Sequence, residues 1–379
     1  MKRELQKYIL QDLPQKIVLI TGPRQCGKTT LSKQLTSNYD YFNYDAGEDR
    51  LALKEKSWDR SKQLIIFDEL QKMKDWKRWL KGIYDTEGIP PQLLVTGSAR
   101  LDIYRKAGDS LAGRHFQFHL HPLDMQEASQ YWQSNGHDIF DRLWHCSGFP
   151  EPFLKGSRSY YKRWQHSHLD IILRQDLLDL YAIRDIQSIE MLVSLLKGRV
   201  GSTISYANLA RDLDRDANTI KRWLSLLEAL YIIYRVKPYH KNIARSLLKE
   251  PKYYFYDHAQ VEDSGARLEN IVANALLKRL DFLKDTQGTS GSLHFLRTKE
   301  GRELDFLICL DDKVTHLVEV KSTDSDPVSG FKHFSPYFPK AKKIQLVKEL
   351  AREKTYPDGV EIRQLISWLL KLNAHVGIS

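Results

Sequence analysis

The sequence predicts an α/β protein in which three patterns follow one another along 379 residues. Between Lys16 and Leu120, short apolar runs alternate with helical stretches, which is typical of a parallel sheet covered by helices. Between Thr203 and Tyr256, two helical stretches joined by a short polar turn precede two extended pieces. From about Arg267 onward, one helix precedes four strand-like runs and a terminal helix, which predicts a small second α/β domain.

Composition bounds the class of protein. The length corresponds to about two or three domains, and 42% hydrophobic with 28% charged residues is typical of a soluble globular chain. Lys and Arg number 58 against 48 acidic residues, and this net charge of +10 favours an anionic partner such as nucleic acid without establishing one.

Cysteine usage and the start of the chain indicate the compartment. Cys26, Cys146 and Cys309 are scattered, which argues against a disulfide framework and against a structural zinc site. No apolar run is long enough to span a bilayer, and the first residues lack the apolar core of a signal peptide. The sequence therefore predicts a cytoplasmic protein with no membrane partner.

The strongest motif directly follows the apolar run IVLIT and opens a helical stretch. It has the pattern GxxxxGK[ST] and consists of Gly22, Pro23, Arg24, Gln25, Cys26, Gly27, Lys28 and Thr29, followed by Thr30. Glycines let backbone N–H groups surround phosphates, and the start of a helix adds partial positive charge. Lys28 is expected to reach the terminal phosphates and Thr29 to ligate Mg²⁺, so the predicted cofactors are ATP and Mg²⁺.

Two later strands add polar groups at their ends. LIIFDE places Asp68 where it can hold Mg²⁺ and Glu69 where it can orient and deprotonate a water. LLVTGS then offers a hydroxyl near the γ-phosphate, from either Thr96 or Ser98.

The segments GPRQCGKTT, LIIFDE, LLVTGSAR and SLAGR together resemble the AAA+ ATPase superfamily. More narrowly, nearly the whole chain resembles bacterial and archaeal ATPases that join an AAA+ domain to a C-terminal domain of unknown function. That resemblance implies a homo-oligomeric ring, with a hexamer as one form. It also implies an arginine finger that reaches a neighbour's γ-phosphate, for which Arg114 is the candidate and Arg100 a competitor.

The middle pattern is that of a winged helix-turn-helix. Ile220, Leu224, Leu227 and Leu230 fall on one helical face, which is expected to be buried. The other face carries Asn218, Lys221, Arg222 and Ser225, and the following hairpin adds Arg235, Lys237, His240, Lys241 and Arg245. This basic face suits DNA, although winged helices also serve as protein-docking modules.

The last domain carries a possible nuclease constellation. Glu319 and Lys321 lie two apart on a predicted strand and therefore share one face, with Asp305 on the strand before and Glu269 on the preceding helix. Asp305 and Glu319 could bind Mg²⁺ while Lys321 positions the attacking water. These residues resemble the PD-(D/E)xK nuclease core, a fold that is also used for DNA binding alone.

These patterns predict four parts of the chain: an AAA+ P-loop ATPase core at 1–140, a helical lid or connection at 141–200, a winged helix-turn-helix at 201–258 and a nuclease-like domain at 259–379. The leading hypothesis is an ATP-driven remodeller of forked or branched DNA, acting by unwinding or branch migration. The alternatives are a nucleotide-dependent switch that docks protein partners and an ATPase-controlled, Mg²⁺-dependent DNA nuclease.

Overall fold

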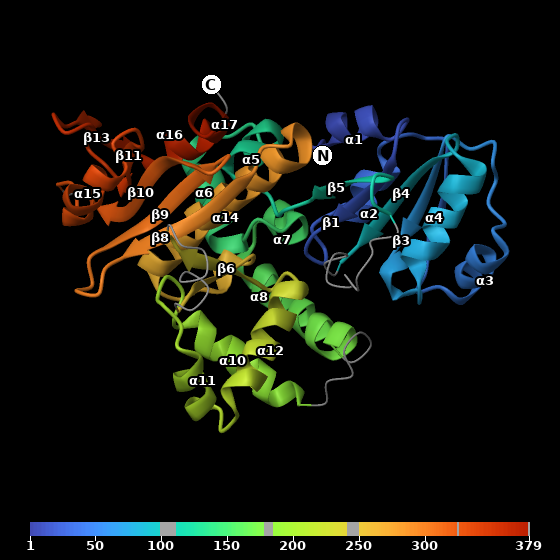
Figure 1. The fold of residues 1–379 in the computed structure, drawn as a ribbon, viewed down its shortest axis with the longest axis horizontal. Coiled ribbons are helices and arrows are strands. Elements are labelled where there is room, and N and C mark those ends of the chain that lie inside the picture. The colour runs from blue at the N-terminus through green and yellow to red at the C-terminus, as the bar shows by residue number, and fades with distance from the viewer. Residues whose placement is uncertain (99–110, 178–184, 241–249, 324–325, 378–379) are drawn as a thin grey trace.

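The computed structural model describes residues 1–98, 111–177, 185–240, 250–323 and 326–377. Figure 1 shows one β-sheet at each end of the molecule, with helices between and below them. The predicted α/β class is confirmed for the first sheet, which is parallel throughout.

The N-terminal sheet has five strands in the order β2-β3-β4-β1-β5. Its strands are β1 (Ile17–Thr21), β2 (Tyr39–Asn43), β3 (Leu64–Asp68), β4 (Gln92–Gly97) and β5 (His115–His119). Its helices are α1 (Gln6–Asp12), α2 (Lys28–Lys33), α3 (Gly47–Glu55), the 3₁₀ turn η1 (Leu70–Lys72) and α4 (Trp76–Glu87). Because all strands are parallel, their carboxyl ends meet at one edge of the sheet.

Helices cover both faces of this sheet, so its central strands β1 and β3 are buried along their whole length. On β1, Val18 and Ile20 belong to one core and Ile17 and Leu19 to another on the opposite face. A strand buried on both faces reads as a continuous apolar run, which is why IVLIT does not alternate.

A helical region follows the sheet. It contains α5 (Met125–Tyr131), α6 (Gly136–Cys146), α7 (Pro150–Lys155), α8 (Arg158–Ile171), the π-helical turn η2 (Ile172–Asp176) and α10 (Ile186–Lys197). The helix-turn-helix pair is α11 (Tyr206–Asp212) and α12 (Ala217–Ala229), followed by strands β6 (Ile233–Pro238) and β7 (Lys252–Phe255) and the turn η3 (His258–Gln260).

The prediction that α12 buries one apolar face is confirmed. Asp216 caps the helix by accepting from the backbone N–H groups of Asn218 and Thr219, both at 2.9 Å. The four residues predicted to face the core are all buried: Ile220, Leu224, Leu227 and Leu230. The winged-helix assignment of 201–258 remains a prediction.

The C-terminal sheet has eight strands in the order β12-β13-β11-β10-β9-β8-β6-β7. Its remaining elements are α14 (Ser264–Gln287), β8 (Gly291–Arg297), β9 (Glu303–Leu310), β10 (Lys313–Thr323), α15 (Ser329–Phe334), η4 (Ser335–Tyr337), β11 (Lys342–Glu349), β12 (Lys354–Thr355), β13 (Val360–Gln364), α16 (Leu365–Leu370) and α17 (Leu372–His375). Strand β6 pairs in parallel with β8 through Lys237 and Pro238. The hairpin that follows α12 therefore extends the C-terminal sheet.

Helix α14 joins the two halves of the molecule. Its 24 residues pack on strands β7, β8 and β10 of the C-terminal sheet and also contact β5 of the N-terminal sheet. One apolar core runs through both regions, from Val18 and Phe118 to Leu276 and Phe306. Within the described ranges, no helix is long and apolar enough to cross a membrane.

Candidate nucleotide site

The phosphate-binding motif forms the turn between β1 and α2, as the sequence predicts. Gly27 has φ +98° immediately before α2, a conformation that favours glycine. A Cβ atom on Gly22 would lie 2.1 Å from the carbonyl oxygen of Leu120, so only glycine fits there. The loop is therefore packed against the chain just after β5.

The Lys28 ammonium lies within the curve of this loop. Its Nζ donates to the carbonyl oxygens of Gly22 at 3.0 Å and Pro23 at 2.8 Å. Lys28 is buried. A cation held at this place is oriented toward the region that the loop surrounds.

Asp68, at the carboxyl end of β3, collects three hydroxyl groups. Its Oδ2 accepts from Thr29 Oγ1 at 2.7 Å and from the Tyr41 hydroxyl at 2.7 Å, and its Oδ1 accepts from Thr96. Burial raises the pKa of the Tyr41 hydroxyl, and the hydrogen bond to Asp68 raises it further. The Thr29 hydroxyl and the Asp68 carboxylate are thus side by side, and both are oxygen donors of the kind that Mg²⁺ prefers.

Glu69 stands beside this group and is held by two other donors. Gln71 Nε2 donates to Glu69 Oε2 at 2.6 Å and Ser98 Oγ donates to the same oxygen at 3.1 Å. Burial raises the pKa of the Glu69 carboxyl, while the nearby Lys28 ammonium opposes this rise. The backbone of Glu69 has φ +55°, a costly conformation for a residue with a side chain and one that clusters at functional sites.

These groups line one cleft of about 700 Å³. The volume is in the range typical of small-molecule sites. Its lining combines the loop and the β3 carboxylates with residues of the N-terminus and of the helical region: Met1, Arg3, Arg24, Gln25, Gly27, Lys28, Thr29, Thr30, Leu31, Gln34, Tyr41, Asn43, Asp45, Asp68, Glu69, Tyr131, Pro150, Glu151 and Leu154. The lining therefore comes from segments far apart in the sequence.

The sequence predicts that either Thr96 or Ser98 lies near the γ-phosphate, and in the structure the two hydroxyls bond different carboxylates. Thr96 bonds Asp68 and Ser98 bonds Glu69. Both hydroxyls are buried at the carboxyl end of β4. The structure brings both to the predicted site.

Arg114 lies at the opposite edge of the sheet. Its carbonyl oxygen accepts from Ile17 N at the amino end of β1, and its guanidinium pairs with Asp85 of α4 at 2.7 Å. The structure gives Arg114 no contact with the phosphate loop of its own chain, so a finger role concerns a neighbouring chain and remains a prediction. Arg100, the competing candidate, lies outside the described residues.

The outer face of α12 is exposed as predicted. Asn218, Lys221, Arg222 and Ser225 are all exposed. In the hairpin, Arg235 pairs with Glu228 at 3.2 Å. Lys241 and Arg245 lie outside the described residues.

The predicted nuclease residues gather at one place on the C-terminal sheet and on α14. The Lys252 ammonium lies 3.1 Å from Glu269 Oε1 and 2.5 Å from Glu303 Oε1. Lys321 Nζ donates to Glu319 Oε1 at 2.6 Å. Within the described part of the chain, no group of three or more His, Cys, Asp and Glu side chains is arranged to hold a metal ion.

Backbone groups complete this arrangement. Asp305 Oδ2 accepts from Val320 N at 2.9 Å, and Glu319 Oε2 accepts from Asp305 N at 3.2 Å. A lysine ammonium group and backbone N–H groups are thus the partners of Asp305 and Glu319 in the structure, and Mg²⁺ binding by these two carboxylates remains a prediction. Burial raises the pKa of Glu319 to about 7, and the neighbouring Asp305 carboxylate adds to the rise.

Sequence reasoning missed several groups that touch the site. Tyr41 bonds Asp68, and Arg3 and His168 bond carbonyl oxygens of the phosphate loop. At the carboxylate cluster of the C-terminal sheet, Lys252 pairs with Glu269. The β2–β3 pairing in parallel register places Tyr41 there. None of these four residues has a spacing in the sequence that signals its role.

Comparison with known proteins supports the prediction of a P-loop ATPase fold in the N-terminal region. The AAA domain family matches residues 14–129. The match spans the parallel sheet and the phosphate-binding loop and supports a P-loop ATPase fold for this region. Two families described as domains of unknown function match residues 137–262 (DUF8612) and 264–366 (DUF4143).

The relatives of this chain are uncharacterised proteins. One from Mycobacterium tuberculosis is 28% identical over 332 residues, which is 83% of this chain and 72% of that protein. One from Haemophilus influenzae is 22% identical and covers 94% of both chains.

Two solved structures with P-loop domains resemble this one distantly. The Thermotoga maritima RuvB Holliday junction branch migration motor has a TM-score of 0.34 and 16% identity, covering 66% of this chain and 96% of its own. The replication initiator DnaA, bound to AMPPCP and single-stranded DNA, has a TM-score of 0.32 and 16% identity, covering 59% of this chain and 86% of its own. Neither similarity reaches a level from which a shared function follows.

Proposed function

We propose that this protein binds and hydrolyses ATP. The observation that carries the proposal is the placement of Lys28, Thr29, Asp68 and Glu69 in one cleft at the carboxyl edge of a parallel sheet. Phosphate oxygens would accept from the backbone N–H groups of the loop and from the Lys28 ammonium.

Thr29 and Asp68 are the residues that would hold Mg²⁺. Their oxygens are 2.7 Å apart, so one ion can contact both with little movement of either side chain. When bound, Mg²⁺ would neutralise charge on the phosphate oxygens.

Glu69 is the group that would orient and deprotonate the attacking water. Burial raises the pKa of its carboxyl, which makes the carboxylate a better proton acceptor. Ser98 and Gln71 hold one carboxylate oxygen, Oε2, and so fix the orientation of the acid.

The test is steady-state ATP hydrolysis together with nucleotide binding. Lys28→Ala is expected to abolish binding or turnover, because the cation among the phosphates is lost. Glu69→Gln is expected to bind ATP and to hydrolyse it at least about 100-fold more slowly, because the base is lost and the loop is kept. Lys16→Ala, before β1 at the opposite edge of the sheet, is the matched control and should turn over normally. Normal turnover by Lys28→Ala or Glu69→Gln would contradict the proposal.

We also propose that DNA is the partner of this ATPase, contacted by the exposed face of α12. Lys221 and Arg222 present two cations there, and the chain carries a net charge of +10. Asn218 at the start of the same helix could reach a base edge. In a homo-oligomer, ATP turnover would then move forked or four-way DNA.

Fluorescence anisotropy across a salt series tests the DNA proposal. Replacing Lys221 and Arg222 together by Ala should weaken binding and lower the salt slope by about 2. Stimulation of ATP turnover by a four-way junction, absent in Lys28→Ala, would support movement on DNA. Absence of salt-sensitive binding would instead favour a nucleotide switch that docks proteins.

A further inference from the structure

Two side chains outside the phosphate loop hold its backbone carbonyl groups. Arg3 Nη1 donates to the carbonyl oxygen of Cys26 at 2.9 Å. His168 Nε2 bonds the carbonyl oxygen of Arg24 at 3.1 Å. Arg3 precedes β1 and His168 lies on α8, so each contact joins a distant segment to the loop.

These contacts have a geometric consequence for the neighbouring N–H groups. A peptide unit is planar and trans, so its C=O and N–H bonds point in opposite directions. The carbonyl of Cys26 shares its peptide with the N–H of Gly27, and the carbonyl of Arg24 shares its peptide with the N–H of Gln25. Holding a carbonyl from outside the loop therefore fixes the opposite N–H away from that contact, toward the inside of the loop.

The backbone of the phosphate loop is left-handed at two positions. Gln25 has φ +62° and Gly27 has φ +98°. Gln25 carries a side chain, so its left-handed conformation is costly and persists only where the surrounding structure holds it, whereas Gly27 adopts such a conformation freely. Both residues line the cleft.

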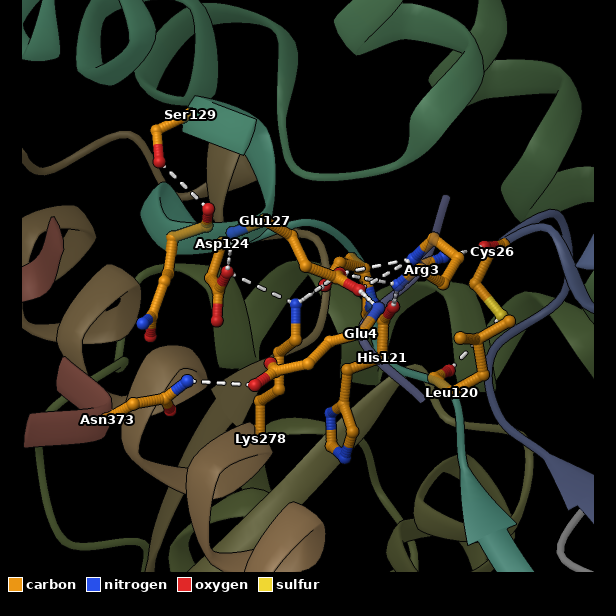
Figure 2. A network of polar contacts seen from close by, with 12 residues as sticks. Arg3, Glu4, Cys26, Leu120, His121, Asp124, Glu127, Ser129, Lys278 and Asn373 are labelled. Atoms are coloured by element: carbon orange, nitrogen blue, oxygen red, sulfur yellow. Dashed lines mark hydrogen bonds and ion pairs between the residues drawn. The ribbon is translucent and has the colours of Figure 1, made fainter. Parts of the chain in front are cut away.

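Arg3 is itself held by a chain of buried charges. Figure 2 shows it between Cys26 and Glu127, with Lys278 of α14 on Glu127 as well. Arg3 Nε donates to Glu127 at 3.0 Å and Arg3 Nη2 donates to the carbonyl oxygen of His121 at 2.6 Å. Lys278 Nζ donates to Glu127 at 2.6 Å. The guanidinium therefore makes five hydrogen bonds, three of them to Glu127, and has little freedom to turn.

His168 is held by aromatic packing. Its ring stacks on Trp164 at 4.5 Å between centroids and also contacts Phe149. Burial lowers its pKa to about 4, so the ring is neutral near pH 7. Because a carbonyl oxygen can only accept, the Nε2 atom carries the hydrogen and donates it.

We propose that Arg3 and His168 are positioning residues for nucleotide binding, which aim the Gly27 and Gln25 N–H groups at the phosphates by holding the carbonyls of Cys26 and Arg24. This inference rests on the proposed ATPase function. It goes beyond the motif because neither residue belongs to the loop.

The experiment is calorimetric titration of the full chain with Mg²⁺-ADP. His168→Phe keeps the aromatic packing and removes the donor, and it should weaken ADP binding about tenfold. His168→Gln restores an N–H donor at nearly the same place and should bind within about threefold of the unchanged protein.

A matched control separates positioning from general packing. His258 is also a buried neutral histidine whose Nε2 bonds a carbonyl oxygen, that of Leu143 at 2.8 Å, and burial lowers its pKa to about 4. His258→Phe should leave ADP affinity unchanged. Equal weakening in His168→Phe and His258→Phe, or none in His168→Phe, would overturn the inference.

Arg3 provides a second and independent test. Arg3→Lys keeps a cation against Glu127 but offers a single ammonium, which cannot span the Cys26 carbonyl and the carboxylate together. It should weaken ADP binding about tenfold, whereas Arg279→Lys should have no effect. Arg279 is the control because it is buried and donates to the carbonyl oxygen of Val376 in another part of the molecule.

The outcomes distinguish this inference from the proposed function. If the unchanged protein binds no ADP, the proposed function fails and the inference fails with it. If the unchanged protein binds ADP and Lys28→Ala does not, while His168→Phe and Arg3→Lys bind normally, only the positioning role is refuted.

Discussion

Replacing Lys252 by Met removes the cation from the carboxylate cluster of the C-terminal sheet. The Lys252 side chain is 1% exposed and contacts both Glu269 and Glu303. Burial acts to lower the pKa of Lys252, but the carboxylates of Glu269, Asp305 and Glu303 raise it overall. The ammonium is therefore charged, and the carboxylates depend on it.

The size of the effect follows from what the carboxylates can do without the cation. Breaking a buried ion pair by removing one partner costs about 3–5 kcal/mol. Protonation of the unpaired carboxylate limits this loss of stability, because neutralising a carboxyl of ordinary pKa at pH 7 takes about 4 kcal/mol. We expect Lys252→Met to lose about 3–4 kcal/mol of stability at pH 7, which for a chain of 379 residues lowers Tm by roughly 4–5 °C.

The loss should depend on pH with a definite sign. Burial and the nearby Asp305 raise the pKa of Glu269 to about 8, and removal of Lys252 raises it further. A carboxyl whose folded pKa lies above its unfolded value favours the fold at low pH, and this contribution is lost as pH rises through the folded pKa. The stability difference between Lys252→Met and the unchanged protein should therefore be nearly constant between pH 5 and pH 7 and begin to widen at pH 8.

Thermal unfolding at pH 5, 7 and 8, with and without Mn²⁺, is the assay. Lys72→Met is the control, since Lys72 pairs with Asp45, whose side chain is 42% exposed, and such pairs contribute about 0–1 kcal/mol. Equal Tm values for Lys252→Met and the unchanged protein at pH 8 would refute the reasoning. A large rise in Tm of the unchanged protein with Mn²⁺, lost in Asp305→Ala, would show that a metal and not Lys252 neutralises the cluster.

Three further predictions concern the N-terminal half. The acid limb of the pH–rate profile should lie above the ordinary pKa of a glutamate, because burial raises the pKa of Glu69 and protonation removes the base; an acid limb near pH 4 would contradict this. Interaction with Asp281 and Asp285 outweighs burial and raises the pKa of His119 to about 9, so its stabilising contribution is complete below about pH 6.5 and is lost as pH rises through 9. Unfolding of His119→Phe should therefore show a smaller loss of stability over that interval than the unchanged protein. Gly22→Ala should abolish ADP binding in the calorimeter, because its Cβ would lie 2.1 Å from the Leu120 carbonyl oxygen; retained binding would show that the loop can shift.

The sequence predicted those parts of the molecule whose chemistry is local. The phosphate loop can be recognised because a few consecutive residues supply its glycines, its cation and its hydroxyl, and the buried strand IVLIT before it sets their direction. The buried face of α12 could be predicted for the same reason, since the helical repeat alone brings Ile220, Leu224 and Leu227 to one side.

Prediction failed where the decisive partner comes from a distant segment. The sequence correctly placed Asp305 beside Glu319, because adjacent strands bring them together, but it did not indicate that Lys252 joins the same cluster. Lys252 pairs with Glu269 and Glu303 from a strand, β7, that joins the same sheet only through the parallel pairing of β6 with β8. No spacing between residues 252 and 269 signals that contact.

The sequence by itself determined the parallel α/β fold of the N-terminal region, its phosphate loop and the two carboxylates at the end of β3, because backbone conformation and strand polarity follow from short-range residue patterns. Only the tertiary structure decided which groups hold that loop and which cation neutralises the C-terminal carboxylates. Arg3, His168 and Lys252 act through side-chain contacts across 17 to 144 residues of chain. Such contacts depend on how helices and sheets pack, because packing sets which distant side chains are buried together and must neutralise or bond one another.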